Sequence, residues 1–180
     1  PTPTLYLARH GRTAYNHERR FQGQLAVTLD QVGLDQARQL AERAAEHHFA
    51  ALWSSPLRRA RETADVVAAR IGLQAREDPR LMETDAGDWT DRTFTDVLAE
   101  APELFARFVA LDPTFAFPGG ESFAAQAARV SEALADIRRG PLPALAVCHG
   151  VVIRLALSGL RDAGEAPPRI ENAALVPLQG

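Results

Sequence analysis

The sequence predicts an α/β sandwich with a mostly parallel central sheet, because short apolar segments alternate with longer segments of helical periodicity. Two apolar segments, residues 4–8 and 144–148, lead into a His-Gly pair, at His10 and at His149. The carboxyl ends of parallel strands meet at one edge of a sheet, and open α/β sheets bind their ligands there. We therefore expect two imidazoles side by side at that edge. Arg9 beside them indicates an anionic ligand, with phosphate as the leading candidate.

The first elements follow from start signals and apolar stripes. After the first strand, residues 16–23 are polar and irregular. Asp30 is the expected N-cap of a helix over residues 31–48. A short strand follows at residues 50–53. The apolar stripe of the helix has five members: Leu34, Ala37, Ala41, Ala44 and Ala45.

A second helix is expected to start with Ser55 as its cap and Pro56 as its first residue. Gly72 is expected to end this helix, and an extended piece follows at residues 73–77. Its buried face has four members: Ala60, Ala64, Val67 and Ile71.

The second half of the chain continues the alternation. Residues 93–111 have a helical pattern that is interrupted near Pro102, and residues 113–120 form a loop rich in proline and glycine. The remaining expected elements are a helix from Phe123 to about Gly140, a strand over 144–148, a helix over 151–160 and a last strand near 173–177.

Composition limits the class of protein. A chain of 180 residues, 46% hydrophobic and 24% charged, is expected to form one domain over residues 1–180. The net charge of −3 gives no reason to expect nucleic acid or a membrane as a partner. There is no span-length apolar run or signal-peptide pattern, and the single Cys148 fits a reducing cytoplasm, so we expect a cytoplasmic protein. All 20 basic residues are arginine, so arginine, histidine or backbone N–H groups must bind any anion.

Six of the eight phenylalanines lie between residues 94 and 123. One interpretation is a small satellite core under a loop. The other is a lid-like segment, at about residues 84–122, whose apolar wall lies near the leaving group of a substrate.

Five motifs occur in order along residues 5–157, and together they resemble the histidine phosphatase superfamily, the phosphoglycerate-mutase-like group. The resemblance is greatest to its compact broad-specificity and α-ribazole phosphatase members, and it implies a three-layer α/β/α sandwich. The motifs are Arg9-His10-Gly11-x-Thr13 with Asn16 and Arg20-x-Gln22-Gly23; Ser54-Ser55-Pro56-Leu57-x-Arg59-Ala60-x-x-Thr63-Ala64; Leu81-x-Glu83-x-x-x-Gly87-x-Trp89; Pro118-x-Gly120-Glu121-Ser122; and His149-Gly150-x-x-Ile153-Arg154.

The resemblance implies phosphoryl transfer in two steps through a phosphohistidine, without a metal or another cofactor. By position in the motifs, His10 is the nucleophile, since a neutral imidazole is a good nucleophile near pH 7. Arg9 and Arg59 are expected to hold the phosphoryl oxygens, on which charge spreads in the transition state. His149, as an imidazolium, is expected to add to that clamp.

The remaining site residues also come from the resemblance. Glu83 is the candidate general acid that protonates the leaving alkoxide and then activates water, with Asp85 as the runner-up. Asn16 is expected to contribute a neutral hydrogen-bond donor. Gln22 and Gly23 are expected to line the pocket entrance.

Three departures from the family pattern leave the subfamily and the substrate open. Arg12 stands where glutamate often follows Arg-His-Gly, and residues 26–30 replace the usual Asp-x-Pro-Leu-Thr. Trp89 is followed by Thr-Asp instead of Glu-Gly. None of these changes removes a catalytic group.

The leading interpretation is a metal-independent phosphomonoesterase acting on a small-molecule phosphate ester. The first alternative is a cofactor-dependent phosphoglycerate mutase. Mutases of this family usually carry a longer basic insertion after the glutamate motif. Residues 84–120 are instead short and aromatic, and their only basic residues are Arg92 and Arg107. The second alternative is a non-catalytic phospho-ligand binding module, although such relatives typically lack the nucleophile or the acid. The sequence leaves the oligomeric state undetermined.

Overall fold

The computed structural model describes residues 4–159 and 165–179. Its strands are β1 (Leu5–Arg9), β2 (Ala51–Ser54), β3 (Ala75–Glu77), β4 (Ala144–Cys148) and β5 (Leu175–Leu178). Its helices are α1 (Ala14–Glu18), α2 (Gln31–Ala45), α3 (Arg58–Ile71), α4 (Phe94–Glu100), α5 (Pro102–Val109), α6 (Phe123–Arg139) and α7 (Gly150–Ser158), with short 3₁₀ turns η1 (Pro79–Leu81) and η2 (Gly87–Trp89). None of these helices is both long and apolar enough to cross a bilayer.

The five strands form one sheet in the order β3-β2-β4-β1-β5. The pairs β1–β4, β2–β4 and β2–β3 are parallel, and β5 is antiparallel to β1 at the edge. This confirms the predicted mostly parallel sheet. Arg9 pairs with Cys148, and Ser54 pairs with Val147, so three strands end at nearly the same level.

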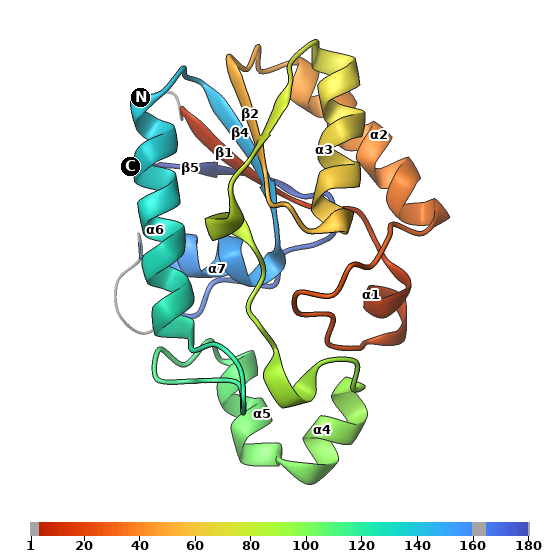
Figure 1. Cartoon of the computed structure of the whole chain (residues 1–180), viewed down its shortest axis with the longest axis vertical. Helices are drawn as coiled ribbons and strands as arrows, with labels where there is room; N and C mark the ends of the chain where they lie inside the picture. The colour runs from red at the N-terminus through yellow and green to blue at the C-terminus, as the bar shows by residue number, and fades with distance from the viewer. Residues whose placement is uncertain (1–3, 160–164, 180) are drawn as a thin grey trace.

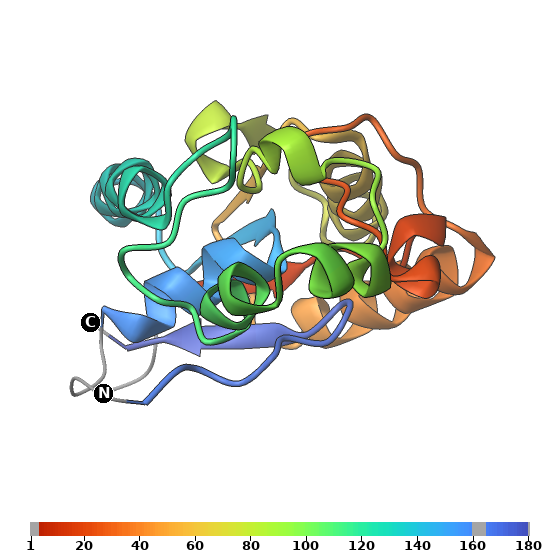
Figure 2. The same cartoon turned by 90° about the horizontal axis from the view of Figure 1, so that it is seen from below.

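Helices cover both faces of the sheet, which confirms the three-layer sandwich. Side chains alternate along a strand, so Leu5 and Leu7 of β1 pack with residues of α6 and α7. Tyr6 and Ala8 pack on the other face with residues of α2 and α3. Figure 1 shows α6 and the α2–α3 pair on opposite sides of the strands, and Figure 2 shows the same separation from below.

Cys148 occupies the core, as its position in a buried strand predicts. It is fully buried among the residues that pack against α6 and α7, on the face opposite Val147. Burial raises the pKa of its thiol. The thiol therefore remains protonated and takes no part in a thiol–imidazole pair with the adjacent histidine.

A third apolar cluster lies beyond the end of the sheet that carries the strand carboxyl termini (Figure 1). We call it the aromatic cluster. Helices α4 and α5 contribute to it, and the break between them at Ala101–Pro102 confirms the predicted interruption. Its buried members are Phe21, Ala86, Trp89, Val97, Leu111, Phe115, Phe117 and Phe123, and Phe94, Phe105 and Phe108 pack against them.

Several predicted boundaries were wrong for identifiable reasons. Helix α3 begins at Arg58, because Leu57 has an extended backbone (φ −63°, ψ +137°) and occupies the N-cap position that was expected for Ser55. Helix α2 ends at Ala45, where residues 31–48 were expected to be helical, and His48 has a φ of +51°.

Two further predicted boundaries differ from the structure, and one lies outside the described residues. The segment predicted as irregular over residues 16–23 begins within helix α1. Strand β5 starts at Leu175, since Ala173 has a φ of +60°, outside the range of a strand. The expected helix end at residue 160 lies outside the described residues.

Candidate active site

The carboxyl ends of β1 and β4 place two imidazoles next to each other. His10 directly follows β1 and His149 directly follows β4, and the two parallel strands are in register. The ring centroids are 5.3 Å apart. Both side chains are buried, with 2% of His10 and none of His149 exposed. The predicted juxtaposition of the two histidines is thereby confirmed.

Backbone contacts fix the orientation of the His10 ring. Its Nδ1 lies 2.6 Å from the carbonyl oxygen of Gly11. A carbonyl only accepts hydrogen bonds, so Nδ1 carries the proton and the lone pair lies on Nε2. Gly11 itself must lack a side chain, because a Cβ there would collide with the carbonyl of Gly33 on α2.

The charge state of His10 follows from its surroundings. Burial lowers the pKa of this imidazole well below 6.5, and the positive charges of Arg59 and Arg9 lower it further. The hydrogen bond to Gly11 acts in the opposite direction but is the smallest of the four effects. His10 is therefore neutral near pH 7, the state in which Nε2 is nucleophilic.

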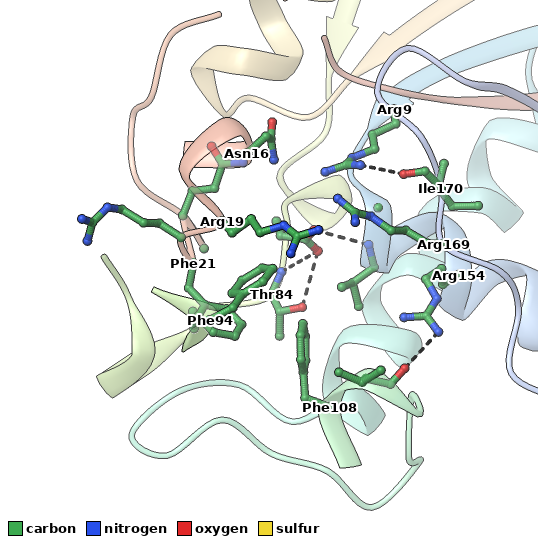
Figure 3. A pocket seen from close by; sticks show the side chains of 18 of the residues that line it. Arg9, Asn16, Arg19, Phe21, Thr84, Phe94, Phe108, Arg154, Arg169 and Ile170 are labelled. Atoms are coloured by element: carbon green, nitrogen blue, oxygen red, sulfur yellow. Dashed lines mark hydrogen bonds between the residues drawn. The ribbon is translucent and has the colours of Figure 1, made fainter. Parts of the chain in front are cut away.

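Two arginines lie beside the histidines, and backbone carbonyls hold both of them. Arg9 donates from Nη1 to the carbonyl of Ile170 at 2.6 Å (Figure 3). Arg59, on the first turn of α3, donates to the carbonyls of Gly23 at 2.6 Å and Leu25 at 3.1 Å. Only 1% of Arg59 is exposed, and burial lowers its pKa to about 10, so it remains charged at neutral pH.

Three buried donor positions at this point have no hydrogen-bond partner among the described residues. They are Nε of Arg9, Nε of Arg59 and Nδ1 of His149. A buried donor without a partner costs about 1–3 kcal/mol, so such groups are normally matched by a ligand or water. A tetrahedral oxyanion such as phosphate fits this set of donors.

His149 interacts with the residue that was predicted to cap α3. Its Nε2 lies 2.7 Å from the Ser55 hydroxyl, which also accepts the Leu57 N–H. The Ser55 proton is then available to Nε2, and this arrangement favours the tautomer with the proton on Nδ1.

The expected imidazolium form of His149 is not the form that its surroundings favour. Burial lowers the pKa of His149 well below 6.5, and Arg59, His10, Arg9 and Arg129 lower it further. His149 is therefore neutral there, and its Nδ1–H is a neutral donor.

Glu83 is held over the same pocket by contacts from three directions. Its Oε1 accepts the Thr84 backbone N–H at 3.0 Å and the Gln126 side-chain N–H at 3.1 Å. Its Oε2 accepts the Val151 N–H at 3.3 Å. Asp85, the runner-up for a general acid, is exposed, accepts the Gly87 N–H and does not line the pocket.

The other predicted binding residues lie at the pocket in different ways. Asn16 lines it, and because its Oδ1 accepts from Thr13 and Asn172, its amide N–H groups remain available to a ligand. Gln22 also lines the pocket while accepting the Thr13 hydroxyl. Gly23 lines it and also supplies the carbonyl that holds Arg59.

The pocket extends from this polar floor to an aromatic wall, and its volume is about 510 Å³. The phenylalanines fit both interpretations of the sequence, a satellite core and a pocket wall. Phe115 and Phe123 are fully buried in the aromatic cluster, as a satellite core requires. Other members line the pocket (Figure 3): Phe21, Phe94, Phe105, Phe108 and Phe117.

Sequence reasoning missed the residues that reach the site from a distance. Gln126 of α6 is fully buried and contacts Glu83 across 43 positions of sequence. The only signal for it was a polar residue on the apolar face of a predicted helix. Arg19 and Arg169 also line the pocket and were not singled out, because each lies in a loop without periodicity.

The fold and the site define an α/β protein with an anion pocket at the carboxyl edge of its sheet. Comparison with known families agrees with this class: the model of the histidine phosphatase superfamily, branch 1, matches residues 5–179. The chain belongs to this superfamily, whose enzymes include phosphatases and phosphoglycerate-mutase-like proteins.

Individual relatives differ in the activity that their names carry. The chain is 36% identical over 178 residues to "Probable phosphoglycerate mutase GpmB" of Enterobacter sp. (strain 638), covering 95% of this chain and 82% of that protein. It is 34% identical to "Phosphoserine phosphatase 1" of Hydrogenobacter thermophilus, covering 75% of this chain and 64% of that protein. The structure of a mycobacterial glucosyl-3-phosphoglycerate phosphatase superposes with a TM-score of 0.87 at 34% identity, covering 97% of this chain and 91% of that one.

Proposed function

We propose that this protein is a metal-independent phosphomonoesterase that hydrolyses small-molecule phosphate esters through a phosphohistidine on His10. The observation that carries the proposal is the geometry of the floor: a neutral His10 with its lone pair on Nε2, beside three buried donors that residues 4–159 and 165–179 leave without a hydrogen-bond partner. This arrangement supplies a nucleophile and an oxyanion clamp at one point.

The first chemical step transfers the phosphoryl group to the protein. His10 Nε2 attacks phosphorus, and the bond from phosphorus to the ester oxygen breaks. Arg9 and Arg59 bind the equatorial oxygens, on which negative charge is spread in the transition state. His149 and Asn16 add neutral N–H donors to the same oxygens.

The proton movements are assigned to Glu83. As an acid it gives a proton to the leaving alkoxide, so the free alcohol departs. As a base it then takes a proton from a water molecule that attacks the phosphohistidine, which releases inorganic phosphate and restores His10. Thr84, Gln126 and the Val151 N–H support this role, because they hold both carboxylate oxygens toward the pocket.

The segment over residues 84–122 is proposed to act as the lid-like wall of the single domain over residues 1–180. Four of the five phenylalanines that line the pocket belong to this segment and support this, since they present an apolar surface to a leaving group. The backbone of Phe21 is hydrogen-bonded to Arg92 and Asp91 of this segment, which ties the wall to the loop after β1.

The test is phosphate release from a panel of phosphomonoesters in EDTA. His10→Ala should lower kcat by at least about a thousandfold, because no other group can form the intermediate. His17→Ala is the matched control, since His17 is exposed and does not line the pocket. Acid-quenched wild type should carry acid-labile label from a ³²P-ester, and His10→Ala should carry none. Turnover that survives in His10→Ala would overturn the proposal.

A phosphoglycerate mutase is the second candidate, and the name of the Enterobacter relative favours it. The two activities differ in the acceptor of the second step. Label from 2-phosphoglycerate that appears in 3-phosphoglycerate faster than in inorganic phosphate would establish the mutase. Label that appears only in inorganic phosphate would exclude it.

A further inference from the structure

The pocket carries more positive charge than one phosphate group can neutralise. Among the described residues, six arginines and a single carboxylate, Glu83, line it. Arg20 is neutralised by an ion pair with Glu18 at 2.9 Å. A phosphate monoester dianion balances two further charges, which leaves an excess of about two with Glu83 ionised and about three with Glu83 protonated as the proposed general acid. The arginines are Arg9, Arg19, Arg20, Arg59, Arg154 and Arg169.

The excess charge lies on three arginines other than the floor residues Arg9 and Arg59, and we call these three the arginine rim. Arg19 follows α1, Arg154 belongs to α7, and Arg169 belongs to the loop before β5. Figure 3 shows them approaching the pocket from these three segments. Three separate parts of the chain therefore bring like charges to one cavity.

Two members of the arginine rim have no neutralising partner. Arg19 and Arg169 are exposed, and neither side chain makes a hydrogen bond or an ion pair with residues 4–159 or 165–179. Most other arginines of the described chain are paired, as in Arg38–Asp35 and Arg70–Glu42. Unpaired guanidinium groups that line a pocket are available to a ligand.

The third member is held in place. Arg154 donates from Nε to the carbonyl of Pro167 at 3.1 Å and from Nη2 to the carbonyl of Val109 at 3.3 Å (Figure 3). Partial burial lowers the pKa of Arg154. Carbonyls orient this guanidinium without neutralising its charge.

The charges of the arginine rim act on the charges of the floor. Burial lowers the pKa of Arg9, and the positive charge of Arg169 lowers it further, while the carboxylates of Glu83 and Glu171 act in the opposite direction. The like charges of the rim and the floor repel each other, and bound anions offset that repulsion. A ligand with a second negative charge is therefore the better electrostatic complement of this pocket.

We propose that Arg19, Arg154 and Arg169 form a second anion subsite. The substrate class is then a phosphate monoester whose leaving group bears a second anionic group, a carboxylate or a phosphate, next to an apolar portion. This inference rests on the proposed function, since it names the substrate class of the same pocket. The aromatic wall contacts the apolar portion, and the arginine rim binds the distal anion.

The experiment compares matched esters that differ only in the distal group. For the carboxylate, the pair is 4-carboxyphenyl phosphate and 4-carbamoylphenyl phosphate. For the phosphate, the pair is 1,4-phenylene bisphosphate and 4-hydroxyphenyl phosphate. Wild type should show a kcat/KM about ten- to a hundredfold higher for the anionic member of at least one pair, because each charge-assisted contact contributes substantially to binding. The pair that responds identifies the anion.

The variant removes the two unpaired charges. In Arg19→Asn/Arg169→Gln, asparagine suits the left-handed backbone at residue 19, where φ is +56°. The ratio of kcat/KM between anionic and neutral esters should fall about tenfold or more, mainly through KM. The control Arg38→Gln/Arg139→Gln removes two charges outside the pocket and should leave the ratio unchanged.

The outcomes separate the inference from the function on which it rests. Wild type that hydrolyses no ester refutes the proposed function itself. Wild type that hydrolyses both members of each pair equally well refutes only the second subsite. A preference for the anionic esters that persists in Arg19→Asn/Arg169→Gln refutes the assignment to these arginines.

Discussion

The floor of the pocket and the arginine rim both consist of cationic and polar groups, yet they are built in opposite ways. The floor residues His10, Arg59 and His149 are at most 2% exposed, and they lie directly after a strand or on the first turn of a helix. Arg19 and Arg169 on the rim are exposed and lie in loops. The floor residues are buried, whereas Arg19 and Arg169 on the rim are exposed to solvent on segments that tolerate change.

This difference separates two tasks of a phosphoryl-transfer site. The transition state of the phosphoryl group is the same for every ester, so the groups that bind it benefit from fixed positions and a low dielectric. The leaving group varies, and the residues that contact it lie on segments that tolerate change. Substitutions on the floor should therefore impair every substrate, while substitutions on the wall or rim should change relative rates.

Arg59→Lys should produce the largest effect among the tests of this comparison. The guanidinium of Arg59 spans two carbonyls and presents a further N–H to the site, which a point-like ammonium cannot reproduce. We expect kcat to fall by about a hundredfold for all esters alike, measured by steady-state phosphate release.

Arg58→Lys is the matched control for this change. Arg58 lies on the same turn of α3, but its side chain is 61% exposed and pairs with Glu62 at the surface. Its substitution should leave kcat within about twofold, because surface ion pairs contribute little. Equal losses in the two variants, or a loss in Arg59→Lys that depends on the ester, would show that the floor is not specialised for phosphate.

The two buried histidines predict that the free energy of unfolding depends on pH. His10 and His149 have lowered pKa values in the folded protein, whereas histidine in an unfolded chain titrates near 6.5. Below pH 6.5 the unfolded chain binds protons that the folded protein does not, so the free energy of unfolding falls as pH falls. Each histidine contributes at most about 1.4 kcal/mol per pH unit in this range.

The measurement is urea unfolding at pH 7.5, 6.5 and 5.5 in buffers without phosphate. His149→Gln removes one of the two proton sites and should lose less stability than wild type between pH 6.5 and 5.5. His17→Gln, at an exposed position, should follow wild type. The window stays above pH 5 because carboxylates with a lowered pKa, such as Asp112 at about 2, lose their contribution only at lower pH. Identical slopes for wild type and His149→Gln would contradict the neutral state of His149.

The two histidines of the floor could be predicted from local signals, whereas Arg59 was identified only through the family resemblance. An apolar run that ends in a His-Gly pair places a histidine at the end of a strand, and two such runs in parallel strands bring His10 and His149 together. The mostly parallel sheet and the break near Pro102 depend on the same short-range patterns, and they were also predicted correctly; the three-layer arrangement was implied by the resemblance.

Other features depend on contacts that no local pattern encodes. The start of α3 was misplaced because Leu57 is extended, and the Ser55 hydroxyl that was expected to cap the helix contacts His149, 94 positions away in the sequence. The neutral state of His149 follows from burial and from surrounding arginines, which only the folded arrangement provides. Arg19 and Arg169 reach the pocket because of loop conformations, so composition indicated arginine as the anion-binding residue without indicating which ones.

Phe108→Leu should have the smallest effect on activity of these substitutions, and it should change the relative rates of different esters without a general loss of phosphate release. Phe108 lines the pocket and packs against the buried aromatic cluster. Replacing its ring removes an aromatic contact worth about 0.5–1 kcal/mol to an aryl leaving group. We expect kcat/KM for phenyl phosphate to fall about threefold relative to ethyl phosphate, measured in the same assay.

Phe115→Leu is the internal comparison, because Phe115 belongs to the same cluster but is fully buried and does not line the pocket. Its ring centroid lies 5.8 Å from that of Phe108. This substitution should lower the free energy of unfolding by about 1 kcal/mol and leave the ratio of phenyl to ethyl phosphate unchanged. If both variants changed the ratio equally, the cluster would act on the leaving group through its packing, and the distinction between a satellite core and a pocket wall would not hold.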